Sequence, residues 1–284
     1  PLNLETRALG FYDVAGNGNP VITVSALTEL PDIVPPVAQT ASINFGTGVV
    51  IVNCSETIDT TPITLLLLSN LFVSQQVNGR DVSLVGDSTF PLDPDNNRLD
   101  SVQIISYDTT SFTVTVTEAM RISAVALSNS AGLNGNNAGT NAIIDVLANA
   151  IVDVATNRNQ GDVGVSVIEI PDSIAPTVLS ATINYGTGIV HLYMSETIDA
   201  TAGSGVATVF NQHYLRAHEN DTTFLIDFTG ATLNQRDHSI VELEMHEQTR
   251  ATTLEHSNTL GGDGSTLKLE VKGSAMSDLY NNPS

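Results

Sequence analysis

Hydrophobic and polar residues alternate over short stretches along most of the chain, and Gly, Asn and Asp separate the stretches. In Val49–Cys54 every second residue is apolar, which is the pattern of a strand with one buried face. Turn residues recur about every ten residues, a spacing typical of β-sandwiches. The pattern predicts one short helix, at Glu118–Ala126. It predicts strands at Ala38–Asn44, Val49–Cys54, Ile63–Leu68, Asp81–Val85, Ser101–Tyr107, Phe112–Thr117 and Ala142–Leu147.

The same pattern returns 140 residues later. Residues 32–59 read DIVPPVAQTASINFGTGVVIVNCSETID, residues 172–199 read DSIAPTVLSATINYGTGIVHLYMSETID, and half of the aligned positions are identical. A second block closes each repeat and occurs three times, at Tyr12–Asn19, Val152–Asn159 and Ser277–Ser284. A repeat of this length predicts two domains with a common all-β framework.

The N-terminal segment matches the end of a repeat. LNLETRALGFYDVAGN, from Leu2, aligns with LKLEVKGSAMSDLYNN, from Leu267, and the sequence given stops at Ser284, before the strand that follows this block in the first repeat. We therefore expect subunits that complete each other. The expected division is an N-terminal segment at 1–31, a first domain at 32–171, and a second domain at 172–284 that lacks its last strand.

The expected donor strand is Val21, Ile22, Thr23, Val24, Ser25, Ala26 and Leu27. Ile22, Val24 and Ala26 are expected to point inward in a neighbouring subunit, as Val163, Val165 and Val167 are expected to do in the first repeat. The offset of 140 pairs Thr23 with Val163, so this phase needs a slip of one residue. The alternative is that residues 20–30 fold back onto their own chain.

Composition narrows the classes of partner. The net charge is −21 with only ten Lys and Arg residues, which argues against nucleic acid and anionic membranes because both require clustered basic residues. The apolar run Thr64–Val73 is too short to span a bilayer, so no membrane insertion is expected. Cys54, the single cysteine, lies at an apolar strand position and is expected to be buried.

The order of Asp-x-x-x-Pro, a Gly-turn hairpin, SETID and Asp-x-x-x-Asn resembles bacterial-type immunoglobulin-like repeats of surface adhesins and cell-wall proteins. The matching residues are Pro36, Ser55-Glu56 and Asp153/Asn157, and then Pro176, Ser195-Glu196 and Asp278/Asn282. The resemblance implies two tandem immunoglobulin-like β-sandwiches. With the N-terminal donor strand segment, the chain also resembles subunits of donor-strand filaments such as pili and glycosylated extracellular fibrils.

Carboxylates recur at equivalent places in the two repeats. Such oxygen clusters suit Ca²⁺, which takes six to eight oxygen ligands in irregular geometry, and the candidate ligands are Glu56, Asp59, Asp153, Glu196 and Asp199. The alternative is that these residues only end strands and close Asx turns. No other cofactor is expected.

Other chemistry has little support in the sequence. All six histidines fall in the second repeat and are expected at the surface, and no nucleophile elbow or phosphate-binding glycine loop is present, so no catalytic set is expected. Two sequons, at Asn53 and Asn220, are candidate sites for covalent glycans in a secreted protein.

These features lead to one leading hypothesis and two alternatives. The first is a non-enzymatic extracellular filament subunit that polymerises with identical subunits, head to tail, by β-strand complementation. The second is a fragment of a repetitive cell-surface adhesin acting as a spacer or binding module. The third is a β-sandwich enzyme that acts on carbohydrates or esters.

Overall fold

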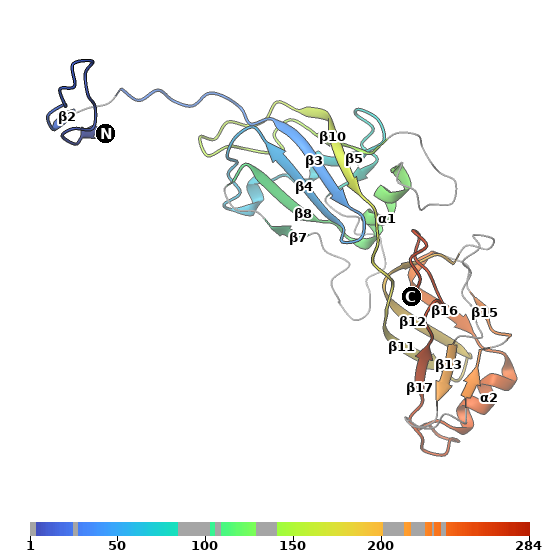
Figure 1. Ribbon diagram of the computed structural model, residues 1–284. Coiled ribbons are helices and arrows are strands. Elements are labelled where there is room, and N and C mark those ends of the chain that lie inside the picture. Colours follow the sequence, from blue (N-terminus) through green and yellow to red (C-terminus); the bar gives the residue numbers. More distant parts are fainter. Residues whose placement is uncertain are drawn as a thin grey trace. The chain divides into compact units, whose positions relative to one another are not determined.

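The structure is a computed structural model, which describes residues 4–24, 28–84, 103–105, 109–128, 141–200, 213–216, 225–228, 230–233 and 237–284. The chain forms two compact units, Pro1–Val34 and Pro35–Ser284. Within the larger unit, strands gather in two lobes, each with its own hydrophobic cluster (Figure 1). The described elements are mostly strands, so the all-β class is confirmed.

The first lobe contains a continuous run of eight paired strands, in the order β6-β5-β9-β10-β3-β4-β8-β7. Its elements are β3 (Ala38–Asn44), β4 (Val49–Cys54), the 3-10 turns η1 (Ile63–Leu65) and η2 (Leu68–Asn70), β5 (Leu71–Ser74), β6 (Val82–Ser83), β7 (Gln103–Ile105), β8 (Ser111–Thr115), α1 (Glu118–Leu127), β9 (Ile143–Val146) and β10 (Asp162–Ile170).

Strand β10 joins the two halves of this lobe. It pairs antiparallel with β9, where Val165 lies opposite Ile144, and then parallel with β3, where Val167 lies opposite Ala41. Val165 and Val167 are buried in the core. Val163, which was expected to point inward as well, is 41% exposed. The expectation for Val163 is wrong because the register shifts between Asp162 and Val165, at a β-bulge around Gly164, which has a φ of +75°.

The second lobe repeats the strands and the helix of the first, without a described counterpart of β10, η1 or η2. Its two separate sheets have the orders β11-β12-β16-β15 and β14-β13-β17. The elements are β11 (Val178–Asn184), β12 (Ile189–Ile198), β13 (His213–Arg216), β14 (Leu225–Asp227), β15 (Thr232–Leu233), β16 (His238–Glu244), α2 (Glu247–Glu255) and β17 (Lys268–Val271).

The smaller unit is a hairpin-like segment. Strand β1 (Leu4–Thr6) pairs antiparallel with β2 (Ile22–Val24), and Leu4 lies opposite Val24. In this structure, residues 22–24 therefore pair with their own chain, as the alternative reading of the sequence expected. Ser25, Ala26 and Leu27 lie outside the described residues.

Most predicted elements of the first lobe are found, and the bounds of β3 and β4 are those predicted. The prediction of a strand at Ile63–Leu68 is wrong. These residues form 3-10 turns, in which Leu65 N–H bonds Pro62 O, and only Leu66 is buried. The strand instead occupies Leu71–Ser74, where Leu71 and Val73 alternate into the core.

Substitution of Gly164 tests the bulge that sets the register of β10. Gly164→Ala should lower the free energy of unfolding by roughly 1–2 kcal/mol, because an L-residue at positive φ is strained, and the new methyl would lie 2.9 Å from Val77. Urea unfolding followed by circular dichroism measures the change, and Ser166→Ala on the exposed face of β10 is the control. Equal stability of the two variants would show that the bulge does not depend on Gly164.

Candidate functional site

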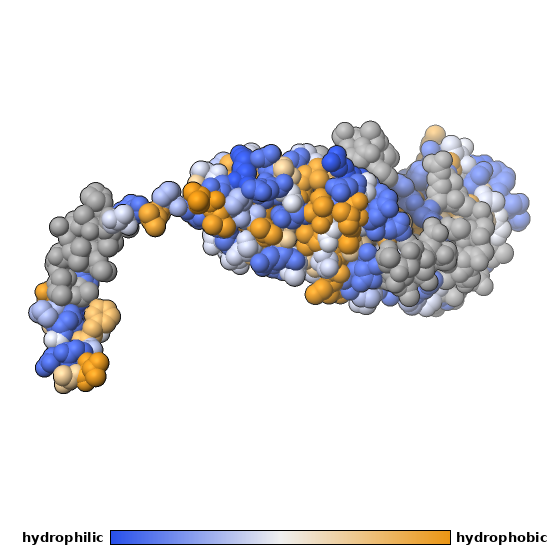
Figure 2. Space-filling view, turned by 90° about the horizontal axis from the view of Figure 1, so that it is seen from above, coloured by the Kyte–Doolittle hydropathy of each residue, from blue (hydrophilic) through white to orange (hydrophobic). Residues whose placement is uncertain are grey.

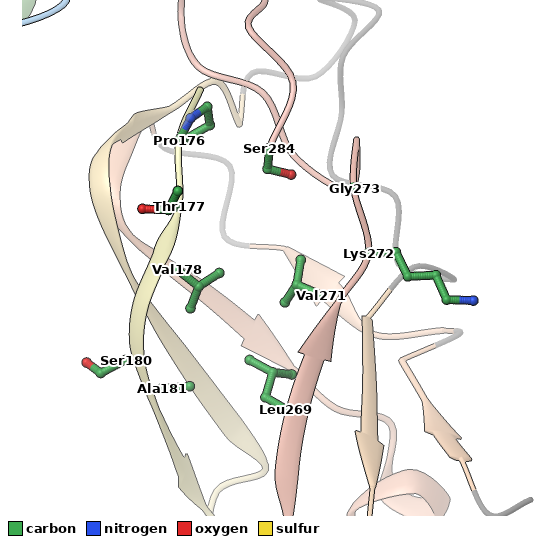
Figure 3. Close-up of a pocket in the computed structure, with 10 residues that line it drawn as sticks. All are labelled: Pro176, Thr177, Val178, Ser180, Ala181, Leu269, Val271, Lys272, Gly273 and Ser284. Carbon is green, nitrogen blue, oxygen red and sulfur yellow. The ribbon is translucent and has the colours of Figure 1, made fainter. Parts of the chain in front are cut away.

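A groove of about 540 Å³ lies between β11 and β17 of the second lobe. In Figure 3 the side chains of Val178, Leu269 and Val271 point into it, whereas Ser180 and Lys272 point away. The strands that border the groove are the counterparts of β3 and β9, between which β10 lies in the first lobe. The groove therefore occupies the position of β10.

Residues that β10 covers in the first lobe are uncovered in the second. Ala41 and Ile43 of β3 are buried, whereas their equivalents, Ala181 and Ile183, are exposed and half-buried. Ile144 and Val146 of β9 are both 0% exposed, whereas their equivalents Leu269 and Val271 are half-buried. Both walls of the groove thus present apolar side chains that one more strand would bury.

The pairing of β2 explains the slip of one residue in the expected donor strand. Leu4 aligns with Ile144, and it lies opposite Val24 just as Ile144 lies opposite Val165. The bulge of β10 adds one residue that β2 lacks, so Val24 and not Ser25 takes the position of Val165. The register of the backbone therefore agrees with the phase expected for Ile22 and Val24.

The loop between β1 and β2 repeats a loop found in both lobes. In all three copies an Asp carboxylate accepts hydrogen bonds from the backbone and side-chain amides of the Asn four residues later: Asp13 with Asn17, Asp153 with Asn157 and Asp278 with Asn282. Leu9, Asn149 and Ser274, at equivalent positions before these loops, all have positive φ. The smaller unit thus has the local structure of the end of a repeat.

The smaller unit also exposes residues that are buried elsewhere. Phe11 is 67% exposed, whereas its equivalents Ile151 and Met276 are each 1% exposed. Hydrophobic residues are visible at the surface of this unit in Figure 2. Within its own unit this segment has no described core to cover Phe11.

A buried arginine, Arg121 of α1, joins the first lobe to the start of the second. Its guanidinium binds Glu118 at 2.7 Å, Asp172 at 2.8 Å and Glu196 at 3.4 Å. It also donates a hydrogen bond of 2.7 Å to the carbonyl of Phe45. Burial opposes ionisation of Glu118, but hydrogen bonds from Arg121 lower the pKa of this carboxyl below its usual value.

Carboxylate oxygens of Asp172, Glu196 and Asp278 lie within 4.8 Å of one another and are all buried. Burial, followed by the negative charge of Asp172, raises the pKa of Glu196 to about 9. Burial also raises the pKa of Asp278. These three residues could hold a cation, and calcium binding remains a prediction.

The five predicted calcium ligands do not all come together. Glu56 and Asp153 place carboxylate oxygens within 4.8 Å of each other in the first lobe, as Glu196 and Asp278 do in the second. The structure does not bring Asp59 or Asp199 into these groups. Asp59 instead accepts a hydrogen bond from Thr61 N–H, while the Asp199 amide donates to Ser277 O.

The remaining candidates are placed as follows. Asn53 is exposed and its side-chain amide donates to Thr40 Oγ1, whereas Asn220 lies outside the described residues. Cys54 is buried, as predicted, and burial raises the pKa of its thiol to about 12. Among the described residues no group of three metal-ligating side chains contains a histidine, and no helix is long and apolar enough to cross a bilayer.

The sequence analysis did not predict the ion pair between Arg121 and Asp172 that joins the two lobes. A signal was present, because Arg121 and Glu118 recur as Arg250 and Glu247, which are 129 residues later.

In comparisons with known proteins, no family model matches the chain and no curated protein matches it significantly.

Glu196→Gln should remove a pH dependence of stability. Because the pKa of Glu196 is about 9 in the folded chain and 4.5 in its ordinary environment, the protonated carboxyl favours folding. This contribution is complete below pH 4.5 and is lost as the pH rises to about 9. With a chelator present, the variant should therefore have a higher Tm than the wild type at pH 8 and an equal Tm at pH 4. Glu244→Gln, at an exposed position, is the control; equal effects at both pH values would contradict the interpretation.

Calcium should act through the same carboxylates. Millimolar Ca²⁺ at pH 8 should raise the Tm of the wild type, because a ligand of the folded state stabilises it, and should raise that of Glu196→Gln less. Thermal unfolding with Ca²⁺ or with excess chelator measures the difference. Identical melting curves of the wild type under the two conditions would leave only the turn and ion-pair roles of these residues.

Proposed function

We propose that the protein is a structural, non-enzymatic subunit of an extracellular filament that polymerises head to tail by β-strand complementation. In this proposal the two lobes are immunoglobulin-like domains, and residues 21–27 of one subunit fill the groove between β11 and β17 of the next. The single observation that carries the proposal is this apolar groove, because β10 fills the equivalent position in the first lobe.

The register of β10 specifies how the donor would lie. It would run antiparallel to β17, with Val24 opposite Leu269 as Val165 is opposite Ile144. It would run parallel to β11, as β10 does to β3. Burying Ile22 and Val24 would contribute roughly 1.5–3 kcal/mol each, and main-chain hydrogen bonds would form on both sides of the strand.

Docking requires β2 to leave β1, its partner within the same chain. This exchange is between similar strands, because Leu2–Thr6 aligns with Leu267–Val271, which includes β17. The β1–β2 ladder is replaced by a β17–β2 ladder, and a new ladder with β11 is added. Complementation therefore exchanges one edge pairing for two pairings, which favours the docked state.

Other features agree with an extracellular filament. The net charge of −21 suits a protein surface exposed to water, and the exposed Asn53 could accept a glycan. Head-to-tail contacts of one kind form an open fibre unless their rotation closes a ring. The alternative, an adhesin fragment acting as a spacer or binding module, would have its groove filled by a strand that follows Ser284 in a longer chain.

A charge placed on the donor strand tests the proposal. Val24→Asp should abolish fibres, because it buries an unpaired carboxylate in the groove. Thr23→Lys places a charge on the opposite face of the strand, beside Glu270 of the neighbour, and should leave fibres largely intact. Electron microscopy and pelleting of both variants measure assembly, with circular dichroism as the check on folding.

The same idea can be tested in trans. A variant that lacks residues 1–30 should form no fibres, and a synthetic peptide of residues 20–31 should bind it and raise its Tm. Fibres from Val24→Asp, or from the deletion variant, would contradict the proposal and favour the adhesin fragment. Binding of the peptide without fibres in the full chain would support the groove but not a filament.

A further inference from the structure

Arg250 of α2 makes two of the contacts that Arg121 makes in the first lobe. Its guanidinium binds Glu247 at 2.7 Å and donates a 2.7 Å hydrogen bond to the carbonyl of Tyr185. The repeat aligns these partners with Glu118 and Phe45, which Arg121 binds at the same distances. The second lobe therefore carries a second copy of these arginine contacts.

The second copy lacks the partners that complete the first. Arg121 also binds Asp172 and Glu196, and Glu118 accepts a hydrogen bond of 2.8 Å from Thr197 N–H. Among the described residues, Glu247 is the one carboxylate paired with Arg250. The side chains of Arg121 and Glu118 are 6% and 11% exposed, whereas those of Arg250 and Glu247 are 25% and 72% exposed.

The space beside these arginine contacts, at Gly186, is also open in the described part of the second lobe. A Cβ added to Gly46 would lie 2.8 Å from Asp172 and 3.2 Å from Ile174, so the linker fits closely against this glycine. Among the described residues, a Cβ added to the equivalent Gly186 would contact only Asn184, a residue of the same turn. The second lobe thus has room for a linker at the place where Asp172 sits in the first.

Another copy of the chain carries the missing partners, one in its smaller unit and two in its first lobe. Asp32, Glu56 and Thr57 stand at the positions that the repeat aligns with Asp172, Glu196 and Thr197. Asp32 is exposed. Few cations are available on a chain with ten basic and 31 acidic residues, so a half-exposed arginine beside an acidic linker is a specific electrostatic match.

The donor strand would bring these partners to Arg250. In the first lobe β10 ends at Ile170, whose carbonyl accepts a hydrogen bond from Phe45 N–H, and Asp172 follows two residues later. In the N-terminal segment Leu30 and Asp32 have the same spacing. With Val24 in the place of Val165, Asp32 follows after eight residues, whereas Asp172 follows Val165 after seven. A donor strand in the β10 position therefore brings Asp32 to the arginine of the lobe that receives it, on a linker that is one residue longer.

We propose that Arg250 and Glu247 of the subunit that receives the donor strand bind Asp32, Glu56 and the Thr57 amide of the subunit that supplies it, in the arrangement that Arg121 forms within one chain. This inference rests on the proposed head-to-tail assembly and adds the second half of its interface. The ion pairs would fix the orientation of successive subunits as well as their order.

The critical concentration for assembly, measured by pelleting at fixed salt, tests the junction. Arg250→Gln should raise it about tenfold, the effect of losing one partly buried ion pair. Arg80→Gln removes the same charge from an exposed turn of the first lobe and is the control for net charge. Gly186→Leu should act like Arg250→Gln by filling the space that the linker needs.

A charge exchange makes the test specific. Arg250→Glu and Asp32→Arg should each weaken assembly, and one chain with both changes should recover most of it, because the new pair forms between copies. If Arg250→Gln matches Arg80→Gln and the exchange restores nothing, the junction is overturned. Because Val24→Asp tests the donor strand separately, fibres that need Val24 but not Arg250 would refute the junction and leave the filament proposal standing.

Discussion

The architecture depends on one strand position, the place between the β3-type and β9-type strands. In the first lobe β10 fills it and pairs with both neighbours, which joins the two halves of the lobe and buries Ile144 and Val146 completely. In the second lobe the corresponding walls stay apart, and their apolar side chains are only partly buried. Sheet edges and apolar grooves are unfavourable in water, so this position needs a strand.

The strand in this position and the contacts of Arg121 are connected directly along the chain. The chain passes from the end of β10, at Ile170, through Pro171 to Asp172, which Arg121 binds. Burial of Arg121 is favourable only because the carboxylates of Glu118 and Asp172, the carboxyl group of Glu196 and a carbonyl satisfy its donors. A proposed subunit contact that repeats the strand would repeat the linker and the ion pairs as well, so shape and charge would select the same partner.

Much of the fold could be predicted from the sequence, because alternation and turn residues are local signals. They gave the all-β class and the bounds of β3 and β4. They misplaced β5, since the run Ile63–Leu68 is as apolar as a strand but folds into 3-10 turns, a choice that depends on tertiary contacts. They could not show the bulge at Gly164, because a bulge is defined by the partner strand.

The candidate site was predictable in part. Repeat alignment indicated the open strand position and the recurring carboxylates, but it grouped Asp59 and Asp199 with residues that they do not join. It missed Arg121 as the partner of Asp172, because the two residues are 51 positions apart and only the fold brings them together. Arg250 and Glu247 repeat Arg121 and Glu118, so the repeat alignment does indicate that these residues form a pair in both lobes.

A disulfide cross-link between copies tests the central claim most directly. In a Cys54→Ala background, Thr23→Cys chains are mixed with Glu270→Cys chains and oxidised mildly. The account predicts that Thr23 lies opposite Glu270 of the neighbour, as it lies opposite Glu5 in its own chain, so disulfide-linked heterodimers should form rapidly. Lys268→Cys, one pair further along the same face of β17, should cross-link far less. Absence of heterodimers, or equal cross-linking at Glu270→Cys and Lys268→Cys, would contradict a donor strand in this groove and register.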